Sequence, residues 1–323
     1  TGSFQVPENY VGSTGSTGTD IEVNYNDHRD SSGNTIEVGD GASIRANTGS
    51  VSFDRSVYPV PFDADDFAEH STAPGSNDLP AGSVIVHISI EDADNDVSAF
   101  GEDSISSSLI DVKISRGSLV SANLASTTAT ILETAPSSGI FEYDLTLASN
   151  VIASSGSGAT AFAAGAVINQ GDIITVTYSD PQDASGKAQT VTDSSSFDLR
   201  NGTLQADKSV YLIGSDMILT LIEPDFDLDN DETESYTLNL IEWDSDAAET
   251  VLGAGGDDSN ATNAAAFDPE PSEFRETGDS TGIFQVVIEI PSTLDSNLLD
   301  RGEKIDLEYT DWGPAGADYV GQE

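Results

Sequence analysis

The sequence predicts an all-β protein made of tandem immunoglobulin-like β-sandwich domains. Three observations predict it: short segments of strand-like hydrophobicity, turn-forming residues between them, and motifs that recur along the chain. Apolar residues that alternate with polar ones are typical of a half-buried strand, and clusters of Gly, Ser, Asn, Asp and Pro favour turns. About seven or eight such strands fall in a full unit, which is enough for two packed sheets. The Cys-Trp-Cys pattern of antibody domains is absent.

The clearest strand segments are Val84–Ile90, Ile110–Ile114, Phe141–Leu147 and Ile173–Tyr178. No segment shows apolar residues at a helical spacing of comparable strength, so the sequence predicts no major helix. Two stretches between strand segments, Ala148–Ala166 and Asp244–Ala266, are expected to be long surface loops that could contact a neighbouring subunit.

A repeated motif marks where a unit begins. Ser56-Val57-Tyr58 recurs 153 residues later as Ser209-Val210-Tyr211, and an Asp followed by a basic residue precedes each copy. We interpret each copy as the opening strand of a domain. Repeats of this kind indicate one structural unit used several times.

A second motif marks the later part of a unit. Ser138–Glu142 and Thr281–Gln285 share a Gly-x-Phe core, which also occurs at Thr1–Gln5. We expect its glycine to adopt a backbone conformation that residues with a Cβ avoid. Each copy precedes a strand segment that ends in Tyr and, two residues on, Asp; these segments are Ile21–Asp27, Ile174–Asp180 and Ile305–Asp311.

The repeats divide the chain into three units. Residues 1–45 are interpreted as the C-terminal half of one domain (the first unit), residues 46–200 as a complete domain (the second unit) and residues 201–323 as a nearly complete domain (the third unit). We expect the chain to be a fragment of a longer tandem array.

Composition excludes several classes of partner and site. The 57 acidic residues outnumber the 11 basic ones, and a net charge of −46 would repel nucleic acid and anionic membranes. No apolar stretch approaches the ~20 residues of a transmembrane helix. Cysteine is absent, which excludes disulfides and thiol chemistry. Salt or divalent cations would screen this charge, although general adaptation to a saline medium would give the same composition.

Two runs of alternating carboxylates follow corresponding strand segments. They are Asp92, Asp94 and Asp96 in the second unit, and Asp225, Asp227, Asp229 and Asp231 in the third. The sequence Asp94-Asn95-Asp96 is taken to correspond to Asp229-Asn230-Asp231. Calcium requires six to eight oxygen ligands, so both runs are predicted to bind calcium or another divalent cation. Neither matches an EF-hand, and a solvated acidic turn is the alternative interpretation.

No catalytic constellation is expected. The chain has no Gly-x-Ser-x-Gly nucleophile motif, and its three histidines, His28, His70 and His87, have no metal-binding spacing. A glycosidase needs two placed carboxylates, but 57 acidic residues bring carboxylates together by chance. The sequons at Asn201 and Asn260 predict glycosylation of an exported protein.

Several of these segments together resemble the surface-layer proteins of marine ammonia-oxidising archaea. The resemblance is carried by Ser209–Ile213, Leu221–Asp231, Thr281–Phe284, Arg301–Ile305 and Tyr309–Asp311, in that order. It covers most of the chain from Ser50 on, and more weakly Thr1–Asp27. It implies an extracellular, cell-surface structural protein of serial Ig-like domains that self-associates into a porous acidic lattice with bound cations, and it transfers no catalytic residues.

A strongly negative lattice would attract cations such as ammonium. The alternatives are a secreted adhesin or carbohydrate-binding array and an accessory domain of an enzyme. Exposed aromatic platforms would favour the sugar binder, and Trp243 and Trp312 are the only tryptophans that could form one.

Overall fold

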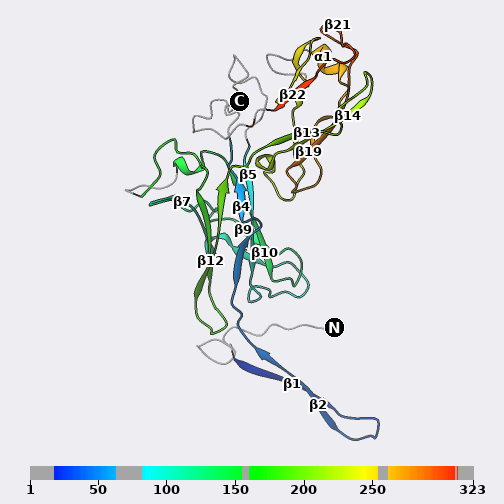
Figure 1. Cartoon of the computed structure of the whole chain (residues 1–323). Helices are drawn as coiled ribbons and strands as arrows, with labels where there is room; N and C mark the ends of the chain where they lie inside the picture. Colours follow the sequence, from blue (N-terminus) through cyan, green and yellow to red (C-terminus); the bar gives the residue numbers. More distant parts are fainter. Residues whose placement is uncertain (1–17, 63–81, 155–159, 254–260, 310, 312–323) are drawn as a thin grey trace.

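The computed structural model describes residues 18–62, 82–154, 160–253, 261–309 and 311 of the 323-residue chain (Figure 1). The protein is all-β, as predicted, with 46% strand and 6% helix. The strands form several small sheets, and no sheet among the described residues combines strands of two units.

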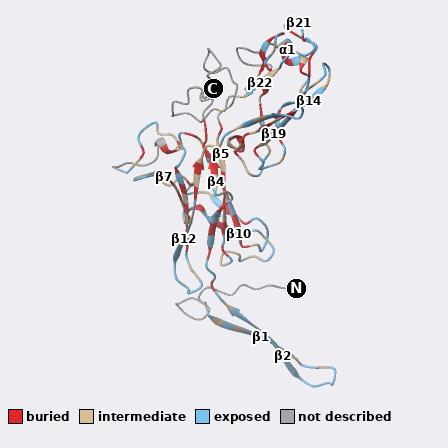
Figure 2. Ribbon diagram, in the orientation of Figure 1, coloured by how far each residue is buried: buried red, intermediate tan, exposed pale blue. Residues whose placement is uncertain are grey.

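The described part of the first unit is a β-hairpin that projects from the rest of the molecule (Figure 1). It consists of β1 (Thr19–Asp27) and β2 (Ile36–Ile44), which pair antiparallel from Thr19↔Ile44 to Asp27↔Ile36. Asp30 closes its turn, because its Oδ1 accepts from the amides of Ser32 and Asn34, both at 2.8 Å. The hairpin is exposed along nearly its whole length (Figure 2).

The second unit contains two larger sheets and a short strand pair. The three-stranded sheet has the order β10 (Ile140–Leu147), β5 (Val84–Glu91), β3 (Ser50–Phe53). The five-stranded sheet has the order β4 (Val57–Pro59), β12 (Gln189–Asp198), β11 (Ile173–Asp180), β7 (Ile110–Arg116), β8 (Leu119–Val120). The pair is β6 (Ser104–Ser106) with β9 (Thr130–Leu132), and two 3-10 helices span Ser107–Leu109 and Val151–Ser154.

The strand pattern predicts burial correctly in this unit. Ile174, Val176 and Tyr178 of β11 are buried and the residues between them are not, while five of the eight residues of β5 are buried. The two sheets also touch, because the Phe53 amide of β3 donates to Asp193 Oδ2 of β12 at 2.9 Å. The buried strands lie at the centre of the molecule in Figure 2.

The third unit repeats this arrangement. One sheet has the order β13 (Thr203–Ala206), β14 (Asp216–Ile222), β19 (Ile283–Glu289), β18 (Glu270–Glu276), β15 (Ser235–Tyr236). Another has the order β17 (Glu249–Val251), β16 (Ile241–Asp244), β22 (Asp306–Tyr309). The remaining elements are β20 (Thr293–Leu294), β21 (Asn297–Leu298), α1 (Ala261–Ala266) and 3-10 helices at Pro224–Phe226 and Leu238–Leu240.

The strand orders of the two units correspond. The series β3-β5-β10 matches β13-β14-β19, and β8-β7-β11 matches β17-β16-β22. The first unit adds a third copy, because β1 and β2 pair as β11 and β12 do: Asp27↔Ile36 corresponds to Asp180↔Gln189, 153 residues on. The repeat inferred from short motifs is therefore present in the strand pairing itself.

The predicted strand Ser209–Ile213 is wrong. This segment forms no strand, and Val210 and Leu212 are 79% and 77% exposed. Its counterpart β4 is a strand because it pairs in parallel with β12. Among the described residues of the third unit, no strand occupies the place of β12, so none of them forms a strand pair with this segment.

The two predicted surface loops are also wrong in part. The stretch Asp244–Ala266 contains β17 and α1, and its Leu252 is fully buried. The stretch Ala148–Ala166 contains a 3-10 helix and the buried Ile152 and Phe162. Isolated large apolar residues in these segments contribute to the core, although the segments are otherwise rich in Ala, Ser and Gly.

None of the helices in the described residues is long and apolar enough to span a membrane.

Candidate metal centres

Two triads of carboxylates lie at corresponding positions of the second and third units. In each triad, one carboxylate oxygen per residue lies within 4.8 Å of the others. The triads are Asp96, Asp103 and Glu133 in the second unit, and Asp227, Glu234 and Glu276 in the third.

The Gly-x-Phe turn holds the glutamate of each triad. Glu133 Oε1 accepts from the amides of Ser138 and Gly139, both at 2.6 Å. In the same way, Glu276 Oε1 accepts from the amides of Thr281 at 2.6 Å and Gly282 at 2.8 Å. These donors fix one oxygen of each glutamate and direct the carboxyl group toward the acidic loop.

The motif glycines are required by this turn, as predicted. Gly139 and Gly282 have φ values of +64° and +57°, a region that favours glycine. A Cβ on Gly282 would lie 2.8 Å from the Cα of Pro224, and one on Gly139 would lie 3.3 Å from the Cα of Ala93.

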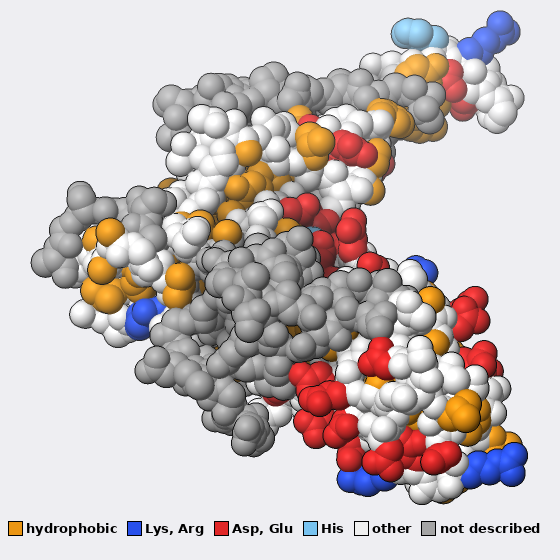
Figure 3. Space-filling model, turned by 90° about the horizontal axis from the view of Figure 1, so that it is seen from above, with side chains coloured by type: hydrophobic (Ala, Val, Ile, Leu, Met, Phe, Trp, Pro, Cys, Tyr) orange, Lys and Arg blue, Asp and Glu red, His pale blue; other side chains and the backbone are white. Residues whose placement is uncertain are grey.

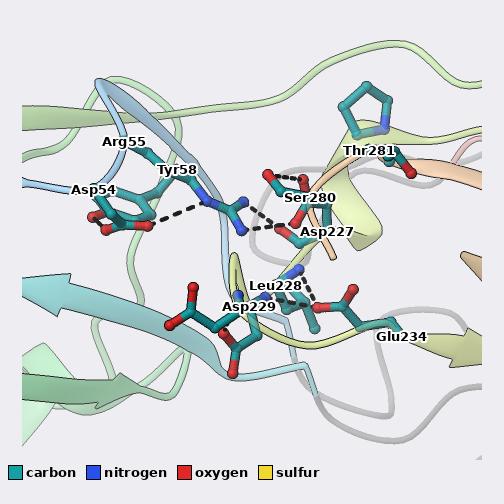
Figure 4. A network of polar contacts seen from close by, with 12 residues as sticks. Asp54, Arg55, Tyr58, Asp227, Leu228, Asp229, Glu234, Ser280 and Thr281 are labelled. Carbon is teal, nitrogen blue, oxygen red and sulfur yellow. Dashed lines mark hydrogen bonds and ion pairs between the residues drawn. The ribbon is translucent and has the colours of Figure 1, made fainter. Parts of the chain in front are cut away.

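The second carboxylate of each triad caps the acidic loop. Asp103 Oδ2 accepts from the amides of Val97 at 2.7 Å and Ser98 at 2.6 Å. Glu234 Oε1 accepts from the amides of Leu228 at 2.9 Å and Asp229 at 2.7 Å (Figure 4).

The third carboxylate comes from the acidic loop itself. Asp96 Oδ2 accepts from Ser137 Oγ at 3.1 Å, and Asp227 Oδ2 accepts from Ser280 Oγ at 3.4 Å. The loops, caps and turns thus agree contact by contact in the two units.

The two centres differ in their electrostatic surroundings. Backbone hydrogen bonds, foremost that from the Asp103 amide, lower the pKa of Glu133. Burial, followed by the hydrogen bond with Glu276, raises the pKa of Glu234 to about 8. Its Oε2 is buried without a hydrogen-bond partner. Carboxylates this close repel one another when all are ionised, and a bound proton or cation would relieve the repulsion that the ion pair of Arg55 with Asp227 leaves.

The third unit's centre also touches the second unit. Arg55 Nη2 donates to Asp227 Oδ1 at 2.7 Å, and Arg55 Nη1 donates to the Asp227 carbonyl at 2.8 Å (Figure 4). The Ile85 amide donates to the Leu228 carbonyl at 3.0 Å. Phe62 and Phe226 pack across the same junction, with ring centroids 6.1 Å apart. The acidic loop of the third unit is therefore partly buried against its neighbour.

Two of the seven predicted ligands, Asp96 and Asp227, lie in the triads. Asp92 is 1% exposed and accepts from the Tyr178 hydroxyl at 2.6 Å. Asp94 Oδ1 accepts from the Asn47 amide at 2.9 Å, and Asp225 Oδ2 from the Arg200 amide at 2.8 Å.

The other two, Asp229 and Asp231, lie beside His87. Asp229 Oδ1 lies 2.9 Å from His87 Nε2, and Asp231 Oδ2 lies 3.9 Å from His87 Nδ1. The predicted correspondence of Asp94 with Asp229 is wrong, because the hydrogen bonds pair Asp96 with Asp227. The Asp-Asn-Asp motif suggested this correspondence, but in the third unit the motif begins four residues after Asp225, the residue that matches Asp94.

Sequence reasoning missed Asp103, Glu133, Glu234 and Glu276. A signal for the glutamates exists, because each lies six residues before the motif glycine in its unit. Asp103 and Glu234 differ in type, and only the matching loop contacts relate them.

A third group that could hold a cation combines the predicted ligand Asp231 with His87 and Glu142, which sequence reasoning missed. His87 is 8% exposed, and its Nδ1 lies 2.9 Å from Asp144 Oδ1. Burial lowers its pKa, but the hydrogen bonds and charges of Asp229 and Asp144 outweigh burial and raise the pKa to about 9. His87 is therefore a cation at neutral pH that ties the acidic loop of the third unit to β5.

The remaining predicted sites are peripheral. Asn201 is exposed, as a glycan acceptor must be, and Asn260 lies outside the described residues.

Acidic side chains form several clusters on the face seen in Figure 3, whereas basic ones are few and separate.

Comparison of the chain with models of known protein families and with curated proteins finds no match.

Proposed function

We propose that this protein is an extracellular structural protein of the surface-layer type, whose units are stiffened by divalent cations, calcium foremost, at the two carboxylate triads. In this proposal each unit is an immunoglobulin-like β-sandwich, and the units form part of a self-associating coat. The observation that carries the proposal is the recurrence of one carboxylate triad at matching positions of two units.

Recurrence separates these triads from chance clusters. A chain with 57 acidic residues brings carboxylates together in many places. Chance does not give two clusters the same amide donors, the same serine partner and the same glycine turn. A repeated arrangement of this kind supports a role that both units share.

The chemistry of the triads suits a hard cation. Calcium binds six to eight oxygens at about 2.3–2.6 Å, and carboxylates are among its preferred ligands. Asp96, Asp103 and Glu133 would supply three of these oxygens, and loop carbonyls and water would supply the rest. In the third unit, Glu234 Oε2 is buried without a hydrogen-bond partner, so a bound cation would stabilise this oxygen most.

A bound cation would have a mechanical consequence. Each triad joins three parts of its unit: the acidic loop, the cap that follows it and the strand before the Gly-x-Phe turn. In the third unit the acidic loop also contacts the second unit through Arg55. A cation at that triad would fix the orientation of one unit relative to the next, as a structural coat requires.

The charge of the chain supports assembly only in the presence of cations. A net charge of −46 makes close packing of copies unfavourable at low ionic strength, where screening extends over ~30 Å. In a saline medium the screening length falls below about 10 Å, and neighbouring copies can touch. The same surface would concentrate cations such as ammonium near the cell.

The alternative of a carbohydrate-binding array has less support. Trp243 is fully buried and packs against Phe267 at a centroid distance of 5.0 Å, so it offers no platform for a sugar ring. Trp312 lies outside the described residues.

Calorimetric titration with calcium tests the proposal. Protein depleted of divalent ions is expected to bind two calcium ions, and its melting temperature should rise. Saturation at about 100 times the dissociation constant stabilises a protein by about 2.7 kcal/mol per site. Glu133→Gln and Glu276→Gln should each remove one binding event.

The matched control is Glu273→Gln, which alters an exposed glutamate on the same strand as Glu276. It should bind calcium like the parent. If the parent shows no binding heat and melts at the same temperature with calcium and with chelator, the cation proposal is wrong. Electron microscopy under both conditions tests assembly separately.

A further inference from the structure

His87 is buried on the outer face of β5, where its neighbours along the strand are open to solvent. Side chains of a strand alternate between two faces, so His87, Ser89 and Glu91 share the face that points away from the core of the second unit. Glu91 is exposed and Ser89 is half-buried, yet His87 is only 8% exposed. The acidic loop of the third unit covers it, and the Leu228 carbonyl of that loop accepts from the Ile85 amide at 3.0 Å.

The imidazole is held as a metal-binding histidine is usually held. Its Nε2 lies 2.9 Å from Asp229 Oδ1 of the covering loop. A histidine that binds a metal through one ring nitrogen almost always donates the N–H of the other, commonly to a carboxylate, and this contact fixes the ring and makes the binding nitrogen more basic. With Asp229 on Nε2, Nδ1 is the nitrogen that is left for a metal.

Three carboxylates from two units surround this imidazole. Asp144 Oδ1 lies 2.9 Å from His87 Nδ1, and Asp231 Oδ2 lies 3.9 Å from it. One carboxylate oxygen of Glu142, one of Asp231 and a ring nitrogen of His87 lie within 4.8 Å of one another. The strand register sets the two residues of β10, because Asp144 lies directly opposite His87 and Glu142 lies two residues along the same face. The side chains of Asp144 and Asp231 are 64% and 65% exposed, so both can rotate toward a shared ion.

The chemistry of these donors differs from that of the two triads. The triads offer carboxylate oxygens alone, which suits calcium. An imidazole nitrogen combined with carboxylates suits zinc and other divalent transition metals, which bind nitrogen and oxygen ligands at about 2.0–2.2 Å. The group around His87 is therefore expected to select a different class of cation.

We propose that His87 Nδ1, Glu142 and Asp231, together with Asp144, bind one divalent transition-metal ion, for which zinc is the probe. The ion would join β5 and β10 of the second unit to the acidic loop of the third. This site goes beyond the proposed function, because none of its ligands belongs to a triad and it does not depend on assembly into a coat.

In the metal-free protein a proton takes the place of the metal. The hydrogen bonds of His87 with Asp229 and Asp144 keep the imidazole protonated at neutral pH. Because Nδ1 must lose its proton to bind a metal, zinc binding at neutral pH should release roughly one proton per ion. Calorimetry in two buffers with different ionisation enthalpies measures this release. Zinc binding without proton release would place the ion away from His87 and overturn the proposal.

Zinc titration in excess calcium tests the ligands. Calcium occupies the triads under these conditions, and moderate salt screens the remaining surface charge. The parent should bind one zinc ion, and His87→Gln should abolish the binding. Asp231→Asn and Glu142→Gln change exposed side chains, so their folding is not at risk. Each should weaken zinc binding at least about tenfold, since even the loss of a group that only orients a metal ligand costs about 10–100-fold.

Glu91→Gln is the matched control, because Glu91 is an exposed carboxylate on the same strand as His87. It should bind zinc like the parent. If Asp231→Asn also binds zinc like the parent, the site does not span the two units and the proposal is wrong. Zinc binding that excess calcium abolishes, or weak binding of several ions that is equal in all variants, overturns it as well. Absence of calcium binding would count against the triads and leave this site unaffected.

Discussion

At the scale of single residues, Gly282 couples the repeated motif to the carboxylate triad. Its amide holds Glu276, and its positive φ turns the chain into β19. A side chain at this position would meet both strained backbone and the Cα of Pro224 at 2.8 Å.

Gly282→Ala should therefore be strongly destabilising. We expect roughly 1–2 kcal/mol from the left-handed backbone and about 1–3 kcal/mol more from the contact with backbone atoms. Gly171→Ala is the control, because Gly171 has φ +83° but nothing within 4 Å of an added Cβ. Urea denaturation measures both variants, and equal losses would contradict the role given to close packing at Gly282.

His87 provides a second test at this scale. It faces Asp144 on β10, Asp229 and Asp231 on the acidic loop, and Glu142, while its amide donates to Asp54. Burial opposes its charge, yet its carboxylate partners raise its pKa from 6.5 to about 9. A raised pKa means that the folded state binds the proton more tightly than the unfolded state.

The His87 contribution to stability should thus be full below about pH 6.5 and disappear as the pH rises through about 9. The melting temperatures of the parent and His87→Gln should differ most near pH 6 and converge by pH 10. Comparison at each pH cancels the titration of other groups, Glu234 included. A difference that stays constant over this range would show that the imidazolium is not the stabilising species.

At the scale of elements, β1 and β11 show that one strand pattern can lie in two environments. Val23 and Val176 occupy the same repeat position, but Val23 is 53% exposed and Val176 is fully buried. Sequence patterns indicate which face of a strand is apolar, and they do not indicate whether another sheet covers it.

This difference predicts unequal mutational costs. Val176→Ala should lower the free energy of unfolding by about 2 kcal/mol, because a buried position loses both apolar contact and packing. Val23→Ala should change it by less than about 0.5 kcal/mol in dilute solution. Urea denaturation of both variants at low protein concentration is the measurement. Similar costs at the two positions would mean that the hairpin is covered.

The same comparison explains which elements the sequence could predict. Strands β5, β10 and β11 were predictable because their apolar patterns are long and bounded by turn residues. The strand expected at Ser209–Ile213 has the same pattern, but a strand also needs a hydrogen-bonding partner. The short strand β17 and helix α1 lie in an Ala-rich stretch whose pattern gives no period.

The candidate site was predictable only in part, for a related reason. Carboxylates that lie close together in sequence, such as Asp92, Asp94 and Asp96, suggest a binding site by their spacing alone. The triads instead combine residues far apart in the chain, and Glu133 reaches Asp96 only because the Gly-x-Phe turn folds back. Local spacing cannot indicate such a contact, whereas comparison of the repeats across their full length could.

At the scale of the whole molecule, the junction between the second and third units combines ion pairs with the aromatic contact of Phe62 and Phe226. Arg55 and His87 of the second unit bind the acidic loop of the third, and Arg200 binds Asp225. The chain has only 11 Lys and Arg residues, and two of them, Arg55 and Arg200, lie at this junction. These ion pairs join the two units, and a cation at the adjacent triad would add a further link between them.

Anomalous diffraction from crystals soaked in a lanthanide ion, used in place of calcium, tests the cation claim most directly. The account predicts one peak within ligand distance of Asp96, Asp103 and Glu133, and another beside Asp227, Glu234 and Glu276. Peaks confined to other carboxylates on the surface, with neither triad occupied, would contradict it.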